Sequence, residues 1–272
     1  METTGSRMGL AGFLGGLWFR RELLGMMVRR DLRNRHAGQA IGMVWAFGQP
    51  VLLMMFYTLL FAYVFPARFA DGGGTSDYSL NILAGLVSWL AFQDLLGRAP
   101  SILVAEANLV KQIIFPTEVL PVKTALASLL PYAGALGFTL AAAVWQGRLD
   151  WTALLVPWLI LCQAMAMIGC ALLLGAVGAF FRDLREFVQL FCTLNLFAQP
   201  ILYDPHRLPD WLSTLLAVNP FSHLVWCWQD ALNNGAILHG WAWVALPLES
   251  LAVLGLGIWA FRHLRHFFGD VL

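Results

Sequence analysis

The chain has 272 residues, of which 59% are hydrophobic and only 12% are charged. Soluble proteins carry about 25% charged residues, so this chain cannot cover a water-facing surface with charge, and its mean hydropathy of +0.69 indicates lipid as its main solvent. An ordinary water-soluble globular protein is therefore excluded. We predict an all-α polytopic membrane protein, in which the net charge of +1 hides an uneven distribution of charges along the chain.

The first 16 residues contain no continuous apolar core followed by a cleavage site, so we expect no removable signal peptide. Residues 17–35 are the most basic stretch. One helical stripe collects its apolar residues Leu17, Leu24, Val28 and Leu32, and the charged residues fall on the other side. This pattern predicts a basic amphipathic interface helix lying on membrane lipids. A solvated basic tail is the alternative.

Six largely uncharged segments are expected to cross the membrane as helices. They are residues 41–65, 80–105, 119–145, 151–181, 187–203 and 241–261. Small residues at spacings of four in the fourth segment, Ala171, Gly175 and Ala179, predict close helix packing. The four cysteines, Cys162, Cys170, Cys192 and Cys227, are expected to be small buried hydrophobic residues rather than disulfide partners or metal ligands.

Ionisable residues inside the expected spans are functional candidates by default. Asp94 and Arg98 stand four residues apart in the second span, so they can pair on one helix face. Glu249 lies in the middle of the sixth span. The alternative is structural, with Asp94 and Arg98 as an intrahelical ion pair and Glu249 protonated or hydrogen-bonded.

Two segments between the spans are too short to cross alone. Residues 106–116 contain two apolar pairs at i, i+4 before Pro116, which predicts a short amphipathic helix on the cytoplasmic side. Residues 210–235 read as two short apolar helices separated at Asn219 and Pro220, with Asp210 and Ser222 as the expected N-caps. We expect them to form a re-entrant hairpin; one proline-kinked span is the rival interpretation.

The distribution of Lys and Arg predicts the topology. With six spans, fourteen of the 17 basic residues lie on one side, and only Arg68, Arg148 and Arg207 lie on the other. Because basic residues accumulate on the cytoplasmic side, both termini are expected to be cytoplasmic.

No cluster of titratable side chains indicates an enzyme. His263 and His266 have no carboxylate or cysteine beside them, so we expect no metal site there. His206, His223 and His239 are expected to be interfacial polar residues. Neither lysine, Lys111 or Lys123, follows a glycine-rich run, so the chain lacks the GxxxxGK[ST] loop that binds nucleotide phosphates.

Aromatic residues make up 13% of the chain. Some lie near span ends and fit interfacial belts. Those within the first and fifth spans could face lipid, or could line a channel whose flat aromatic faces stack on sugar rings and let a polymer slide. The channel candidates are Trp45, Phe56, Tyr57, Phe61, Phe191, Phe197 and Tyr203.

Several segments together resemble the polysaccharide-export permeases of the ABC-2 type. They are RRDLRNRHAGQAIGMVWAFGQP (29–50), FYTLLFAYVF (56–65), NLVKQIIFPTEVLP (108–121), FFRDL (180–184), QPILY (199–203) and NP (219–220). Their order and spacing match over nearly the whole chain. The first segment, which continues to PARF (66–69), looks most like the O-antigen (lipopolysaccharide) exporters, with capsule and teichoic acid exporters as close relatives. Gln199 and Gln229 depart from the usual family pattern.

The resemblance implies a transport subunit rather than an enzyme. Such permeases reside in the bacterial inner membrane, form homodimers and bind two copies of a separate ATPase, which carries the ATP and Mg, so no cofactor and no nucleic acid is expected on this chain. The substrate would be a polyprenyl-diphosphate-linked polysaccharide. A membrane-embedded enzyme acting on lipid-linked sugars is the alternative from a different class.

The resemblance also assigns roles to segments. Residues 106–116 would be the coupling helix that contacts the ATPase, and residues 210–235 would be gate helices on the periplasmic side. Our own hypothesis is that arginines of the interface helix attract the lipid diphosphate. The candidate residues are Glu106, Asn108, Lys111, Ile114 and Phe115 for coupling, Arg29, Arg30, Arg33 and Arg35 for lipid entry, and Trp211, Asn219, Pro220 and Phe221 for the gate.

Overall fold

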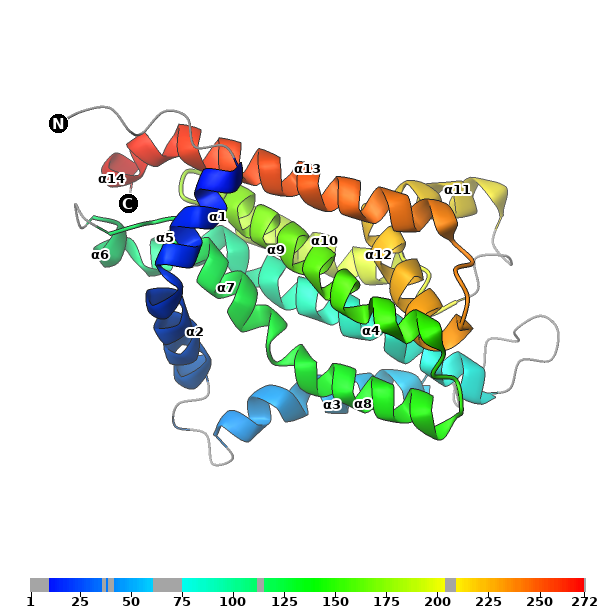
Figure 1. Cartoon of the computed structure of the whole chain (residues 1–272). Coiled ribbons are helices and arrows are strands. Elements are labelled where there is room, and N and C mark those ends of the chain that lie inside the picture. Colours follow the sequence, from blue (N-terminus) through cyan, green and yellow to red (C-terminus); the bar gives the residue numbers. More distant parts are fainter. Residues whose placement is uncertain are drawn as a thin grey trace.

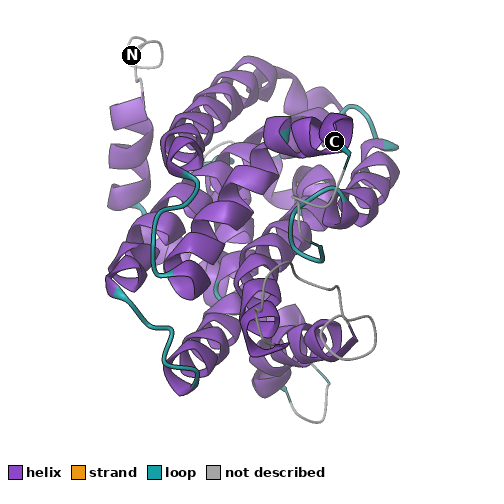
Figure 2. Ribbon diagram, turned by 90° about the vertical axis from the view of Figure 1, so that its right-hand side faces the viewer, coloured by secondary structure: helices purple, strands orange, loops and turns teal. Residues whose placement is uncertain are grey.

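The computed structural model describes residues 10–35, 38, 42–60, 75–111, 115–203 and 209–271. Throughout these residues the chain forms helices and loops and no strand, which confirms the predicted all-α class (Figure 2). The helices in chain order are α1 (Leu10–Phe19), α2 (Arg21–Arg35), α3 (Met43–Leu59), α4 (Thr75–Arg98), α5 (Ile102–Ala105), α6 (Ala107–Val110), α7 (Val119–Leu129), α8 (Tyr132–Trp145), α9 (Val156–Gly178), α10 (Leu184–Phe197), α11 (Asp210–Val218), α12 (Pro220–Gln229), α13 (Gly240–Leu264) and α14 (Phe268–Val271).

Four apolar helical segments within the described residues are long enough to cross a membrane. They are Tyr78–Ala105, Val119–Trp145, Trp151–Gly178 and Gly240–Phe267, and they overlap the second, third, fourth and sixth expected spans. The other two expected spans correspond to shorter helices, α3 with 17 residues and α10 with 14 residues. The end of the first expected span lies in residues 61–74, outside the described part.

The third apolar segment is two helices rather than one. α7 ends at Leu129 and α8 begins at Tyr132, so the break falls at Pro131. Proline lacks a backbone N–H and its ring clashes with the preceding turn, which explains the interruption. Each half has its own neighbour, since α2 packs against α7 and α3 packs against α8.

α9 and α13 pack against each other more extensively than any other pair of helices in the described chain. Their backbones approach closely because both helices present glycine. A Cβ atom on Gly169 would lie 2.6 Å from backbone atoms of Val253 and Leu254, and one on Gly257 would collide with the carbonyl of Gly169. The glycine pair therefore fixes this helix crossing.

The predicted small-residue face of α9 is also buried, and it packs on the turn after α4. Gly175 is buried, and a Cβ there would lie 3.5 Å from the carbonyl of Ala99. Ala171 and Ala179 are buried beside it. The four cysteines are free thiols, and all are buried except Cys170, which is half-buried.

The segments with expected functions lie at opposite ends of the molecule. α1, α2, α5, α6 and α14 gather at one end, and α11 and α12 lie at the other, where α13 begins (Figure 1). The long helices α4, α9 and α13 run between the two ends. We call them the α6 end and the α12 end.

Candidate functional site

The four candidate arginines of α2 fall into two groups. Arg29, Arg30 and Arg33 are exposed, whereas the Arg35 side chain is only 11% exposed and contacts two carboxylates, those of Asp31 at 2.7 Å and Asp94 at 3.3 Å. The apolar stripe explains this division, because its buried residues dock α2 on α7 and turn three arginines outward. Arg35 therefore anchors α2 to its neighbours, and its guanidinium group is largely buried, unlike those of the other three arginines.

Asp94 is the centre of a charged cluster at the ends of three helices. Arg98 donates to its Oδ1 from Nε at 3.1 Å and from Nη2 at 3.0 Å, which confirms the pairing predicted from their spacing. Arg35 donates to its Oδ2 at 3.3 Å and also to the carbonyl of Ala127 in α7 at 3.1 Å. The contact between Arg35 and Asp94 joins residues 59 positions apart, so no local pattern in the sequence could reveal it.

A cavity of about 440 Å³ opens beside this cluster. Besides Asp94 and Arg98, its polar walls include Gln93, Tyr132 and Arg185. The side-chain oxygen of Gln93 is buried and accepts no hydrogen bond from the described residues. The cavity therefore offers the charged groups of Asp94, Arg98 and Arg185 to a polar ligand.

The expected coupling segment is less helical than predicted. Within residues 106–111, α6 forms only the single turn Ala107–Val110, and Ile114 lies outside the described residues. Asn108 and Lys111 are exposed, while Phe115 is half-buried and packs against the core. Within the described residues of this segment, Asn108 and Lys111 are the side chains that a partner could reach.

Glu106 already forms an ion pair within the chain. Its Oε1 accepts a hydrogen bond from Nζ of Lys123 at 2.6 Å, and the Lys123 side chain is 7% exposed. A buried ammonium group requires a nearby opposite charge. Glu106 therefore ties the coupling segment to α7 and is not a freely presented contact for a partner.

The candidate channel aromatics gather on two helices. On α3, Trp45 and Phe56 are exposed and Tyr57 is half-buried; on α10, Phe191 and Phe197 are exposed. The Tyr203 hydroxyl donates to the carbonyl of Phe197 at 2.6 Å, which fixes the turn that follows α10. Phe61 lies outside the described residues.

The exposed apolar faces of α3 and α10 include aliphatic as well as aromatic side chains. Aliphatic side chains extend them, namely Leu52, Leu53 and Met55 on α3 and Leu190 and Leu194 on α10. α10 buries its opposite face, including Val188 and Cys192. Both helices can therefore face lipid, a second subunit or a cargo.

At the α12 end, Asn219 organises the junction between α11 and α12. Its Oδ1 accepts from the backbone N–H of Phe221 at 3.1 Å, and its Nδ2 donates to Asn195 Oδ1 and to the carbonyl of Ala198, both at 2.8 Å. The expectation that Ser222 caps this helix is wrong, because Asn219 is the N-cap and Pro220 occupies the first turn. Asp210 likewise lies inside the first turn of α11, after Pro209.

Phe221 connects the same junction to the core. Its ring meets those of Trp89 and Phe92 edge-on, with centroids 5.3 and 5.2 Å apart, and lies 5.9 Å from the ring of Phe191. Such arrangements are favourable for aromatic pairs. Trp211 on α11 is exposed by contrast.

The expectation that His223 is an interfacial polar residue is wrong, because it is buried and paired. Its Nδ1 lies 2.8 Å from Glu249 Oε1, and its Nε2 lies 2.9 Å from the carbonyl of Ala217. Burial alone would lower the pKa of His223, but the hydrogen bonds to Glu249 and Ala217 outweigh it and raise that pKa above its ordinary value. Glu249 thereby links α13 to α12.

His239 also pairs with a carboxylate. Asp230 is fully buried. Its carboxylate accepts hydrogen bonds from the backbone N–H groups of Leu238 and His239 and from the side chains of Asn234 and Trp243, at 2.9 to 3.2 Å. Its Oδ1 also lies 3.1 Å from Nδ1 of His239. Burial favours a higher pKa for Asp230, but these hydrogen bonds hold it below the usual value. The cluster closes the turn between α12 and α13.

No group of three or more His, Cys, Asp and Glu side chains in the described ranges could hold a metal ion. The site is therefore a set of surfaces and paired charges, distributed over the two ends and the exposed faces of α3 and α10.

Comparison with known proteins places these features in a family. The model of the ABC-2 type transporter family matches residues 22–230. Because this match covers more than half of the chain, the chain belongs to the ABC-2 type transporter family, and it is a membrane protein with apolar helices long enough to span a bilayer.

Similar curated proteins are permeases and transport proteins. The O-antigen export system permease protein RfbA of Klebsiella pneumoniae is 23% identical over 253 residues, covering 92% of this chain and 95% of that protein. RfbA of Myxococcus xanthus is 27% identical over the same shares. The polysialic acid transport protein KpsM of Escherichia coli is 21% identical, covering 86% of this chain and 90% of that protein.

Proposed function

We propose that this chain is the permease subunit of an ATP-driven exporter that moves a polyprenyl-diphosphate-linked polysaccharide, an O-antigen, across the bacterial inner membrane. The observation that carries the proposal is the similarity to O-antigen export permeases over 92% of the chain. The similarity to a polysialic acid transport protein supports the broader class of polysaccharide export, with capsule as the second candidate cargo.

In the proposed exporter, two copies of the chain form a homodimer with six spans each and cytoplasmic termini, so that the α6 end is cytoplasmic. Two ATPase subunits bind ATP and Mg and contact Asn108, Lys111, Ile114 and Phe115. Glu106 acts indirectly, because its ion pair with Lys123 joins the coupling segment to α7. Movement of this segment would therefore be transmitted through this ion pair to α7 and the membrane-spanning helices.

The proposed path runs along α3 and α10. Arg29, Arg30 and Arg33 attract the anionic diphosphate at the cytoplasmic entry, while Arg35 keeps α2 in place. The exposed aromatic rings then offer flat faces to successive sugars without binding particular hydroxyl groups. α11 and α12 gate the periplasmic exit, held by Asn219 and Phe221.

The test is assembly and export with a partner ATPase. We expect the full chain, co-expressed with a partner ATPase, to purify as a two-plus-two complex. Replacing Asn108→Ala and Lys111→Glu together should lower ATPase recovery and surface polysaccharide about tenfold, since a reversed charge at an interface rim opposes association.

Arg148→Glu, an exposed charge at the α12 end, is the matched control. Full assembly and export by the double variant, or an enzymatic activity on lipid-linked sugars that needs no ATPase, would contradict the proposal.

A further inference from the structure

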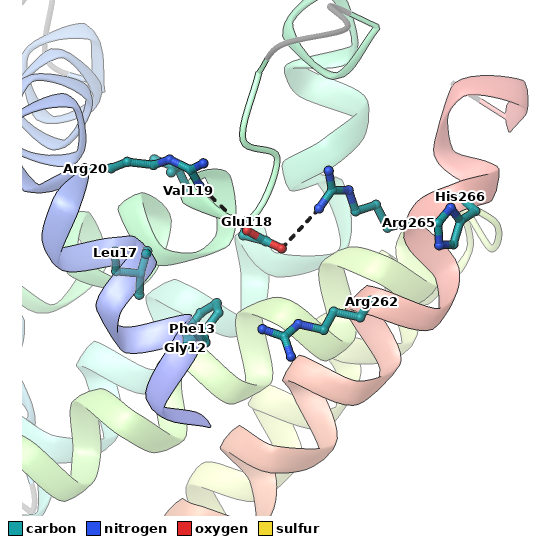
Figure 3. A pocket seen from close by; sticks show the side chains of 10 residues that line it. Gly12, Phe13, Leu17, Arg20, Glu118, Val119, Arg262, Arg265 and His266 are labelled. Carbon is teal, nitrogen blue, oxygen red and sulfur yellow. Dashed lines mark hydrogen bonds and ion pairs between the residues drawn. The ribbon is translucent and has the colours of Figure 1, made fainter. Parts of the chain in front are cut away.

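A second cavity lies at the α6 end, away from the proposed path, and has a volume of about 500 Å³. Phe13 and Leu17 of α1 form one wall, Glu118 and Val119 lie behind it, and Arg262, Arg265 and His266 form the opposite wall at the end of α13 (Figure 3). The volume falls within the range of small-molecule sites.

Basic side chains line the described part of the cavity around the carboxylate of Glu118. Glu118 Oε1 accepts from Arg265 Nη1 at 3.3 Å, and its Oε2 lies 4.0 Å from Arg20 Nη1. Arg262 extends from α13 toward α1 (Figure 3). Among the described lining residues, the guanidinium groups of Arg20 and Arg265 thus share the single carboxylate of Glu118. Each guanidinium carries five N–H donors, and the side chains of Arg20 and Arg265 are about half exposed, so donors remain for an anion.

The cavity is also amphipathic. Phe13 is buried and Leu17 packs against the core, so the α1 wall is apolar. Just beyond this wall, Trp18 and Phe19 are 72% and 90% exposed, and Phe267 beside the α13 wall is exposed too. Exposed aromatic rings next to arginines are typical of the headgroup level of a bilayer.

We propose that this cavity binds the phosphate headgroup of an anionic phospholipid from the surrounding leaflet. The guanidinium groups of Arg20 and Arg265 bind the phosphate, and the Phe13 and Leu17 wall receives the start of the acyl chains. The bound lipid links the N-terminal helix α1 to the C-terminal end of α13. The proposal does not depend on the identity of the exported cargo.

The test is binding of phosphatidylglycerol to the full chain in phosphatidylcholine nanodiscs, measured by native mass spectrometry. Since each arginine near a membrane surface contributes roughly fivefold to binding of anionic lipid, the Arg20→Gln, Arg265→Gln double variant should bind about 25-fold more weakly. Glu118→Gln removes the competing carboxylate and should bind about fivefold more tightly. Arg182→Gln, an exposed arginine outside the cavity, should leave binding unchanged.

The opposite signs of the two cavity variants separate binding from misfolding. Weaker binding in both, or unchanged binding in both, would overturn the proposal. Two further probes identify the source of the phosphate. If inorganic phosphate occupies the site as tightly as phosphatidylglycerol, or if only undecaprenyl diphosphate shows dependence on the arginines, the lipid proposal is wrong.

Discussion

Arg35 shows how one side chain can have a role different from that of its neighbours. It bridges Asp31 and Asp94 and donates to the carbonyl of Ala127, so it joins α2 to α4 and α7. Removing it leaves Arg98 as the described ion-pair partner of Asp94. We expect Arg35→Gln to lower the free energy of unfolding by about 2 kcal/mol, because hydrogen bonds to charged groups are among the stronger ones and Arg35 is largely buried.

The measurement for this variant is thermal unfolding of the purified chain in one detergent. Arg33→Gln is the matched control, because it removes the same charge from an exposed position on the same helix, and it should change stability by less than about 0.5 kcal/mol. Equal losses in the two variants would show that net charge, not the cluster around Asp94, stabilises α2.

At the scale of elements, the crossing of α9 and α13 depends on a glycine that no side chain can replace. A methyl group at Gly169 would stand 2.6 Å from the backbone of α13, where only a shift of the whole helix could relieve the clash. We expect Gly169→Ala to destabilise the chain by about 2 kcal/mol, as overpacking does in other cores, with the loss measured by thermal unfolding.

Gly255 provides the control for that substitution. It lies in α13, and an added Cβ there meets no described atom within 4 Å. Gly255→Ala should therefore be neutral or stabilising by up to about 1 kcal/mol, because alanine favours helix more than glycine does. A destabilisation of both variants to the same extent would mean that glycine is needed for helix flexibility rather than for close approach.

The sequence predicts elements better than it predicts the contacts between them. The all-α class, the Leu24, Val28 and Leu32 stripe of α2 and the pairing of Asp94 with Arg98 follow from periodicity and spacing, which are local. The predicted single helix over residues 17–35 is wrong, because the chain turns at Arg20 and places Leu17 in α1. The contacts of Arg35 with Asp94 and of His223 with Glu249 join distant segments and leave no local pattern. The N-cap of α12 is Asn219 rather than Ser222, because Asn219 directly precedes Pro220, which fits the first helical turn.

For the molecule as a whole, α3 and α10 are among the helices whose apolar faces remain exposed in a single chain. Lipid alone could cover them, but the same faces carry the aromatic residues proposed to line the path. The two possibilities differ in whether water reaches these helix faces. A channel face is wetted during transport, whereas a face toward lipid stays dry.

Thiol labelling of the assembled exporter distinguishes these possibilities. The native cysteines are buried or half-buried, so they give little background. We expect Phe56→Cys and Phe191→Cys to react with a membrane-impermeant maleimide about tenfold faster than Leu256→Cys on the exposed side of α13, because the reactive thiolate forms in water and not in lipid. The labelling should require the ATPase partner and ATP. Equal, slow labelling at all three positions under turnover would place α3 and α10 against lipid and remove the aromatic faces from the transport path.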